Sequence, residues 1–401
     1  MAGGKGERLY PLTLERTKPS VPFGGKYRII DFVLSNFINS GIFSIYVLVQ
    51  YKSQSLIEHI RSSWKRQGML SRHFITVVPP QMRTGEREWY RGTADSVFQN
   101  MNLILDFKPD LVVVFGGDHI YRMNIQDMIN AHIKNKSDVT VACCPFSKSR
   151  ASSFGVVEMD NNSRIIGFKE KPKNTDSIAD DYIYASMGNY IFNPNILVES
   201  LNEDFNLATS AHDFGKDIIP KLIKNSNVYA YNFAKNKIPG LKNYEKKDYW
   251  QDVGTIESFW SSNMDLLGDK PLLDLDNKDW PIYASSLDCP AAKINNSCIV
   301  NSLISEGCVL EGASIKNCIL GRGVIIDKGV TVEDTIIMDF THIKKNSVIK
   351  KAIIDRFNII PEATTVSPDL NTLEDAFVDK DSGITVIKRG QRKFSNLPLS
   401  L

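Results

Sequence analysis

A glycine-rich segment near the start of the chain carries the residues best suited to bind phosphate. In Gly3-Gly-Lys-Gly-Glu-Arg8 the glycines let backbone N–H groups approach a phosphate closely, and Arg8 and Lys18 add positive charge. The loop is not a Walker A motif, because no Gly-Lys-Ser/Thr follows, and it lacks the third glycine of the dinucleotide fingerprint. A surface turn would explain the glycines alone equally well. Arg8 and the pair Lys18-Pro19 strengthen the phosphate interpretation.

Two aspartates are candidate ligands of a metal ion. Asp118 lies three residues beyond the apolar run Leu111–Phe115, and ligands of open α/β sheets bind beyond the carboxyl ends of strands. Asp252 could complete a carboxylate pair for Mg²⁺ with it. Asp118 could also merely cap the next turn. His119 could act as a base, although a histidine hydrogen-bonded within a loop is the more frequent case.

Three segments place an aromatic residue beside charged or small polar residues. They are Trp89-Tyr-Arg-Gly-Thr-Ala-Asp95, Phe168-Lys-Glu-Lys-Pro172 and Tyr249-Trp-Gln-Asp-Val-Gly254, which contains Asp252. Lys171 in the second could hold a sugar phosphate. Taken singly, each segment is more often a solvated loop than a binding site.

An alternation of strands and helices must position these residues. Ile45–Val49, Leu111–Phe115 and Val139–Cys143 are short continuous apolar runs, as in strands buried on both faces of a mostly parallel sheet. Residues 28–40 have one apolar helical face before Gly41, and residues 94–106 and 124–135 are predicted helices too. Residues 1–265 therefore predict a Rossmann-like α/β domain with a mostly parallel sheet.

A different periodicity begins after residues 266–290, which have no clean period and which we interpret as a linker. From 291 to 401, apolar residues recur every six positions, for example at Cys298, Ile304 and Leu310. Val324, Val330 and Ile336 continue the series, with Ile326, Val332 and Met338 in parallel. A helix cannot use a period of six, whereas a triangular parallel β-helix places one apolar residue inward per side. Ordinary antiparallel strands are the alternative.

Composition narrows the class of protein. The 401 residues predict two or three domains at about 150 residues each. With 48 basic and 46 acidic residues the net charge is +2, which argues against a nucleic-acid-binding protein. Six cysteines without a C-x-x-C pair favour neither disulfides nor structural zinc. No membrane-spanning run and no signal peptide are recognisable, so we expect a reduced, cytoplasmic protein.

The motifs, taken together, resemble one family. Ala2–Arg8 with Lys18-Pro19 is similar to the signature of the sugar-phosphate nucleotidyltransferases. Within that superfamily the chain resembles glucose-1-phosphate adenylyltransferase, also called ADP-glucose pyrophosphorylase, over nearly all of residues 1–265 and in the hexad domain. The further segments that carry this resemblance are Phe23–Phe32, Leu34–Asn36, Gln50-Tyr51, Trp89–Asp95, Gly116–Tyr121, Ala185–Gly188, His212–Asp217 and Tyr249–Thr255.

The resemblance implies a reaction and a set of roles. ATP and α-D-glucose 1-phosphate would give ADP-glucose and diphosphate with Mg²⁺, for glycogen or starch synthesis, and the hexad domain would be a left-handed parallel β-helix. Arg8 is a better candidate than Lys5 for transition-state charge, since its fork can contact two phosphate oxygens. The implied residues are Arg8, Lys18 and Asp118 for catalysis; Gly3, Gly4, Gly6, Tyr90, Gly92 and Thr93 for the nucleotide; Gly155, Glu170, Lys171 and Ser186 for the sugar phosphate; and Asp118 and Asp252 for the metal.

The resemblance also implies a homotetramer and control by a small-molecule effector. Fructose-bisphosphate-activated bacterial members are expected to have a lysine three residues before the Lys-Pro pair. Glu15 stands there, and a carboxylate would repel a phosphorylated activator. We therefore expect weak or absent activation by fructose 1,6-bisphosphate.

Three alternatives stay open at this point. The first is a related pyrophosphorylase that uses another nucleotide or sugar, such as UDP-glucose, dTDP-glucose or GDP-mannose. The second is a non-catalytic regulatory subunit of a hetero-oligomer, although no phosphate or metal contact has been lost. The third is a bifunctional enzyme with acetyltransferase activity in the β-helix, for which His342 is the only histidine after residue 265.

The phosphate loop begins unusually early. A loop of this kind should follow a buried central strand, yet here it starts at Ala2. We therefore expect the first strand to be missing, the chain as written to be unstable or aggregation-prone, and Gly3–Arg8 to be poorly anchored. We expect the true product to start roughly 10 to 30 residues upstream, with an apolar run of about five residues before Met1.

Overall fold

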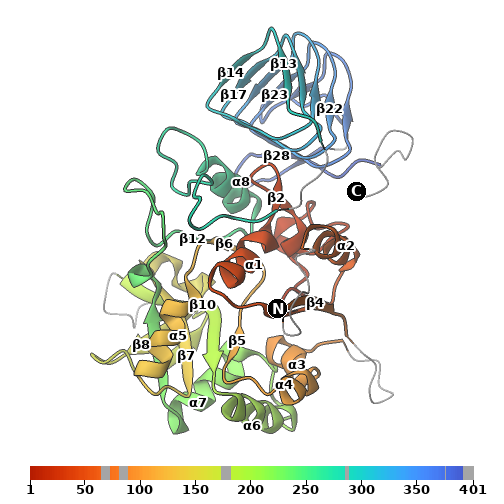
Figure 1. Ribbon diagram of the computed structural model, residues 1–401. Coiled ribbons are helices and arrows are strands. Elements are labelled where there is room, and N and C mark those ends of the chain that lie inside the picture. Colours follow the sequence, from red (N-terminus) through yellow and green to blue (C-terminus); the bar gives the residue numbers. More distant parts are fainter. Residues whose placement is uncertain (65–72, 81–88, 173–181, 285–288, 375, 392–401) are drawn as a thin grey trace.

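The computed structural model describes residues 1–64, 73–80, 89–172, 182–284, 289–374 and 376–391. Figure 1 shows an α/β domain with a stack of β-coils at one end, and α8 (Ile256–Met264) and β28 (Thr385–Ile387) lie at the junction. The prediction of a Rossmann-like α/β domain followed by a parallel β-helix is confirmed.

The main sheet of the α/β domain has the order β11-β7-β10-β8-β9, and β5 pairs with β10. β7 and β11 are parallel, and β5 and β7 both run antiparallel to β10, so β5, β7 and β11 share one direction. Because β10 runs antiparallel to its neighbours, the sheet that we predicted to be mostly parallel is a mixed sheet. The strands are β5 Val112–Val114, β7 Val139–Ser147, β8 Gly155–Met159, β9 Ile165–Glu170, β10 Tyr182–Phe192 and β11 Val228–Asn232.

Two strands stand apart from this sheet. β3 (Ser44–Leu48) and β4 (Phe74–Val78) form a separate parallel pair, in register from Ser44 opposite Phe74. No strand pairs β3 with β5 among the described residues. Two short antiparallel ladders complete the domain, β1 (Pro22–Phe23) with β2 (Tyr27–Arg28), and β6 (His119–Tyr121) with β12 (Trp250–Asp252).

The helices form largely where the apolar periodicity predicts them. α1 (Ile29–Asn39) buries Ile30, Val33, Leu34 and Phe37, and it ends before Gly41, whose φ is 73°. The helix predicted at 94–106 is instead two, α3 and α4, because the Asn100 side chain donates to the Ser96 carbonyl and interrupts the turn. The others are α2 Gln54–Ser63, α3 Thr93–Phe98, α4 Met101–Phe107, α5 Ile125–Lys134, α6 Pro194–Phe205, α7 Ile219–Asn225 and α8 Ile256–Met264.

The β-helix has three faces of parallel strands. One face is β13 (Lys293–Asn295), β16 (Val309–Glu311), β19 (Ile325–Ile326), β22 (His342–Ile343) and β25 (Ile359–Ile360). The second is β14 (Cys298–Val300), β17 (Ser314–Lys316), β20 (Thr331–Glu333), β23 (Val348–Lys350) and β26 (Thr365–Val366). The third is β15 (Leu303–Ile304), β18 (Ile319–Leu320), β21 (Ile336–Ile337), β24 (Ala352–Ile354) and β28 (Thr385–Ile387), with β27 (Phe377–Val378) antiparallel at its edge.

The strict period of six is wrong in detail. Partner residues on successive coils are 16 or 17 apart, as in Lys293, Val309, Ile325 and His342, so one or two sides of each coil are shorter than six. Cys298 is therefore exposed rather than inward. On the third face Ile337 fills the core, while Ile336 and Met338 pack against the α/β domain.

The segment interpreted as a linker is packed against both domains where it is described. Leu266, Leu273 and Ile282 are buried in the same apolar cluster as Ile319 and Ile353 of the β-helix. A buried ion pair joins the domains as well, because Arg16 Nη2 lies 2.5 Å from Asp355 Oδ2. In the described part of the chain no helix combines the length and apolarity needed to cross a membrane.

Candidate active site

Two adjoining cavities contain every site residue predicted from the sequence. The first, of about 620 Å³, is lined by Arg8, Lys18, Asp118, Gly155, Glu170, Lys171, Ser186 and Asp252 among others. The second, of about 430 Å³, is lined by Gly3, Gly4, Gly6, Tyr90, Gly92 and Thr93 among others. The two cavities share Gly6, Lys18, Thr93 and Asp118, so they meet at the charged residues.

The β6–β12 ladder brings the two aspartates together. Asp252 is the register partner of His119, and Asp118 directly precedes β6. Ligand atoms of Asp118, His119 and Asp252 all lie within 4.8 Å of one another. Nδ1 of His119 is buried and has no hydrogen-bond partner among the described residues. His119 is therefore part of the cluster, which the sequence alone did not favour.

Lys18 inserts its ammonium group between the two carboxylates. Its Nζ lies 2.6 Å from Asp252 Oδ1 and 3.1 Å from Asp118 Oδ2, and only 7% of its side chain is exposed. Burial opposes the charge on Lys18, but the two carboxylates outweigh it and hold the pKa of the ammonium above its usual value. Burial likewise opposes ionisation of Asp118, yet the Lys18 charge holds the pKa of this carboxyl well below its usual range.

Arg8 approaches the same cluster from the outside. It lies in the 3₁₀ turn η1 (Glu7–Leu9), with its side chain 68% exposed and Nη2 3.7 Å from Asp252 Oδ2. Gly254 permits this approach, because a Cβ there would lie 3.0 Å from both Arg8 Nη2 and Asp252 Oδ1. The guanidinium is thus positioned by Asp252 and open to a ligand in the cavity.

The donor set of this cluster fits Mg²⁺. Hard divalent cations prefer carboxylate oxygens, and Asp118 and Asp252 supply two of them close together. The Lys18 ammonium between them demonstrates that the position favours positive charge. The fit therefore rests on the two carboxylates, with His119 beside them.

The carboxylate of Glu170 lies close to the backbone of two glycines in the larger cavity. It ends β9 opposite Gly155, the first residue of β8. A Cβ at Gly155 would lie 2.8 Å from Glu170 Oε2, and one at Gly215 would lie 2.7 Å from it. Glycine at both positions therefore makes room for the carboxylate. Lys171 Nζ lies 3.4 Å from Glu170 Oε1 with its side chain 59% exposed, so the ammonium is accessible to a ligand.

Ser186 lies at an irregularity in β10. The register between β10 and β7 shifts between Ser186 and Tyr190, and the Gly188 amide is 3.3 Å from Ser186 Oγ. Ser186 is buried, and Gly188 has a φ of 69°. The bulge places Ser186, Met187 and Gly188 on the cavity wall.

The second cavity is built around Tyr90 and Thr93. Gln50 Oε1 accepts from the Tyr90 amide at 2.6 Å, and Asn100 donates to the Tyr90 hydroxyl at 2.9 Å. Thr93 begins α3 and donates its hydroxyl to Asp213 Oδ2 at 2.9 Å. A Cβ at Gly92 would lie 2.2 Å from the His212 carbonyl oxygen, so this close approach requires glycine.

The glycine loop borders both cavities. Gly6 has a φ of 63°, and a Cβ there would lie 3.1 Å from both Lys18 Cβ and Thr13 Cγ2. A Cβ at Gly3 would lie 3.2 Å from Gln50 Cβ, whereas Gly4 faces open space. The loop thus packs closely on Lys18, and the backbone of its glycines lines the cavities.

Sequence reasoning missed three contributors to the cavities. Asp213 belongs to a segment quoted for the resemblance, but no role was assigned to it. It accepts from Thr93 and from the Gly215 and Lys216 amides, so it joins α3 to the π-helical turn η4 (Phe214–Ile218). Gln50 and Gly215 also belong to segments quoted for the resemblance, again without an assigned role. Their signal lies in contacts between distant segments, which spacing along the chain does not reveal.

Comparison with known families agrees with this geometry. Residues 1–269 match the Nucleotidyl transferase family, and residues 289–387 match the family described as GlmU-like, C-terminal hexapeptide. The second match and the three parallel faces together complete the predicted architecture, a left-handed parallel β-helix after the α/β domain.

Similar proteins cover nearly the whole chain. A glucose-1-phosphate adenylyltransferase of Thermodesulfovibrio yellowstonii is 50% identical over 398 residues, which are 98% of this chain and 95% of that protein. Proteins of the same name from Photobacterium profundum and an Anaeromyxobacter species are 44% and 42% identical, each over 98% of this chain and 97% of the relative. The chain therefore belongs to the glucose-1-phosphate adenylyltransferase family.

Proposed function

We propose that the protein transfers the adenylyl group of ATP to α-D-glucose 1-phosphate, releasing diphosphate and forming ADP-glucose. The observation that carries the proposal is the meeting of two cavities at Lys18, Asp118 and Gly6. One cavity has the glycine loop and Tyr90, which suit a nucleotide, and the other has Lys171 and Ser186, which suit a sugar phosphate. The two phosphates would then meet at the charged cluster.

The chemistry needs charge neutralisation more than a base. A phosphate oxygen of the sugar attacks the α-phosphorus in line, diphosphate leaves, and the nucleophile is already an anion. Lys18 and Arg8 would neutralise charge on the triphosphate, and the amides of Gly3, Gly4 and Gly6 would donate to it. Lys18 would exchange part of its contact with the carboxylates for one with phosphate, which its long side chain allows.

The sugar phosphate would bind at the opposite side of the cluster. Lys171 would contact its phosphate, and Glu170 would accept from sugar hydroxyls while remaining seated between Gly155 and Gly215. Ser186 would lie near the sugar, and Tyr90, Gly92 and Thr93 along the adenine nucleotide. These assignments follow from the side chains that line each cavity.

Asp118 and Asp252 would hold Mg²⁺, which when bound neutralises phosphate charge and orients the reacting oxygens. The support is the pair of carboxylates on the β6–β12 ladder. Glycogen or starch synthesis, the homotetramer, the allosteric effector and the cytoplasmic location remain predictions from the family resemblance and the composition.

Diphosphate release measured with each nucleoside triphosphate and each sugar 1-phosphate tests the proposal. ATP with glucose 1-phosphate should exceed every other pair in kcat/KM. A preference for UTP, dTTP or GTP would identify a related pyrophosphorylase instead. Absence of activity with every pair, in a folded protein that still binds ATP, would favour a regulatory subunit.

A further inference from the structure

A buried, hydrogen-bonded pair of side chains, Asp204 and His212, lies behind the cavity that contains Tyr90. His212 Nδ1 lies 2.7 Å from Asp204 Oδ2, and both side chains are buried. Ser210 joins the pair, because its hydroxyl donates to Asp204 Oδ1 at 2.6 Å and accepts from the His212 amide at 2.9 Å. None of the three is among the described residues that line either cavity. Any effect of the pair on a ligand therefore passes through the backbone that it holds.

The backbone of His212 is left-handed. Its φ is 53°, in a region that residues other than glycine adopt uncommonly. The side chain is held by Asp204 and the amide by Ser210, so both ends of this conformation are fixed by hydrogen bonds. These contacts set the direction of the His212 carbonyl.

The His212 carbonyl caps the start of α3. It accepts from the Ala94 amide at 2.9 Å and from the Asp95 amide at 3.3 Å. Amides of a first helical turn have no partner within their own helix, and the N-cap residue Gly92 has no side chain to offer one. A Cβ at Gly92 would lie 2.2 Å from the same carbonyl oxygen. A distant segment of the chain thus supplies the cap and determines where Gly92 lies.

The residues beside this cap line the cavity. Gly92 and Thr93, which we call the nucleotide segment, both do so. Thr93 donates its hydroxyl at 2.9 Å to Asp213, the residue after His212. A displacement of the His212 carbonyl would therefore displace the whole nucleotide segment.

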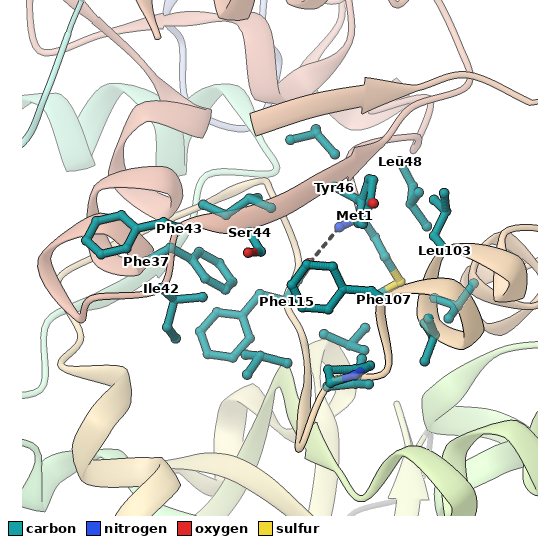
Figure 2. A pocket seen from close by; sticks show the side chains of 18 of the residues that line it. Met1, Phe37, Ile42, Phe43, Ser44, Tyr46, Leu48, Leu103, Phe107 and Phe115 are labelled. Carbon is teal, nitrogen blue, oxygen red and sulfur yellow. Dashed lines mark hydrogen bonds between the residues drawn. The ribbon is translucent and has the colours of Figure 1, made fainter. Parts of the chain in front are cut away.

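The other contacts of α3 and α4 are largely apolar. Val97 of α3 and Leu103 and Phe107 of α4 line an apolar cavity of about 450 Å³ beside β3 and β5 (Figure 2). Toward α6, Phe98 stacks on Phe205 with ring centroids 4.1 Å apart. Apolar attraction has no preferred direction. The orientation of the nucleotide segment therefore depends on the hydrogen bonds at the start of α3.

We propose that Asp204, acting through His212, is a positioning residue for the nucleoside triphosphate. This inference rests on the proposed function, which assigns the cavity of Tyr90 and Thr93 to the nucleotide. Without the carboxylate, the His212 side chain loses its partner and its carbonyl is free to turn away from α3. The nucleotide segment then loses its orientation, whereas Lys171 at the sugar-phosphate end has no contact with the pair.

The KM values of an Asp204→Ala protein test the proposal. The KM for ATP should rise by about tenfold or more, as for loss of a buried hydrogen bond to a charged group, and the KM for glucose 1-phosphate by less than about threefold. Asp204→Asn should restore most of the affinity for ATP, because its amide oxygen can still accept from His212. His212→Asn tolerates the left-handed backbone but is too short to reach Asp204, so it should resemble Asp204→Ala.

Two substitutions in α6 are matched controls. Leu197→Ala removes a fully buried side chain about two turns before Asp204, so it should lower the free energy of unfolding without changing either KM. Glu203→Gln alters the neighbouring carboxylate, which is exposed and paired with Lys221, and it should change neither quantity.

An unchanged KM for ATP in a folded Asp204→Ala or His212→Asn protein would overturn the proposal, and so would equal changes in the two KM values. If either control raised the KM for ATP as much as Asp204→Ala does, Asp204 would have only a structural role. Where Asp204→Ala does not fold, Ser210→Ala must raise the KM for ATP by about threefold, and no change there also overturns the proposal.

Equilibrium binding of nucleoside triphosphates separates this test from that of the proposed function. If the unaltered protein prefers another triphosphate, or releases no diphosphate, the proposed function fails. The affinity for the triphosphate that it binds best should still fall by about tenfold in Asp204→Ala. An unchanged affinity would overturn the positioning role alone.

Discussion

Replacing Asp118 by asparagine separates the catalytic interpretation of the charged cluster from a structural one. The change keeps the size of the side chain and removes one negative charge next to Lys18. Asparagine is a poor ligand for Mg²⁺, and the excess positive charge would change how the triphosphate is held. We expect turnover to fall by a factor on the order of 10² to 10⁴, as for loss of a charge-stabilising contact.

The expected loss of transition-state stabilisation and the expected loss of folding free energy differ enough to distinguish the catalytic from the structural interpretation. Each factor of ten in rate is about 1.4 kcal/mol, so the expected loss is about 3 to 5 kcal/mol of transition-state stabilisation. Folding should lose much less, because the Asp118 side chain is 37% exposed and such ion pairs contribute about 1 kcal/mol or less. Lys18 also keeps its 2.6 Å contact with Asp252.

Diphosphate release over a range of Mg²⁺ concentrations, together with urea unfolding, measures both effects. Asp106→Asn, the same change at an exposed position of α4, is the matched control and should leave both unchanged. Near-normal turnover of the Asp118→Asn protein would refute the metal assignment. A loss of folding free energy as large as the loss in rate would assign Asp118 a structural role instead.

Four further outcomes are expected. Lys171→Ala should raise the KM for glucose 1-phosphate by about tenfold or more and change that for ATP far less, and equal changes would contradict its assignment. Asp355→Asn should lower the free energy of unfolding in a urea titration by about 3 to 5 kcal/mol, because it leaves the charge of the buried Arg16 unpaired. Glu15→Gln removes an exposed ion pair and should change the same quantity by less than about 1 kcal/mol. Fructose 1,6-bisphosphate should activate weakly or not at all because of Glu15, and a large activation in a titration would show that other residues bind it. Burial lowers the pKa of His132, so as the pH falls below about 6.5 this histidine takes up a proton more readily in the unfolded chain than in the folded protein. The free energy of unfolding measured in urea should therefore be smaller at pH 5 than at pH 7, and the difference should be smaller in the His132→Gln protein.

The residues that the family resemblance implied for the site line two adjoining cavities, while their roles stay predictions. Glycine, lysine and aspartate carry their chemistry in the side chain or its absence, so such residues can be selected from short motifs. The pairing of Asp252 with His119 joins segments more than a hundred residues apart, and local spacing contains no record of it. The same holds for Asp213, whose partners lie in α3.

The β-helix shows a different limit. Apolar periodicity predicted the coils, but each coil has 16 or 17 residues. A strict period of six, which would need 18 residues per coil, therefore no longer marks the inward-facing positions after one coil. Ile336 and Met338 are apolar for a second reason, contact with the α/β domain. One-dimensional patterns do not distinguish the two kinds of burial.

The segment Arg16–Lys18 ties the β-helix to the charged cluster. At one end Arg16 is paired with Asp355 of the β-helix in a fully buried contact, and two residues later Lys18 lies between Asp118 and Asp252. Thr17 between them is completely buried, so the segment has little freedom to relax. Because interiors are close-packed and transmit strain, a shift of the β-helix against the α/β domain would move the Lys18 ammonium relative to its carboxylates. The two domains therefore cannot be treated as independent when the activity of variants at their interface is interpreted.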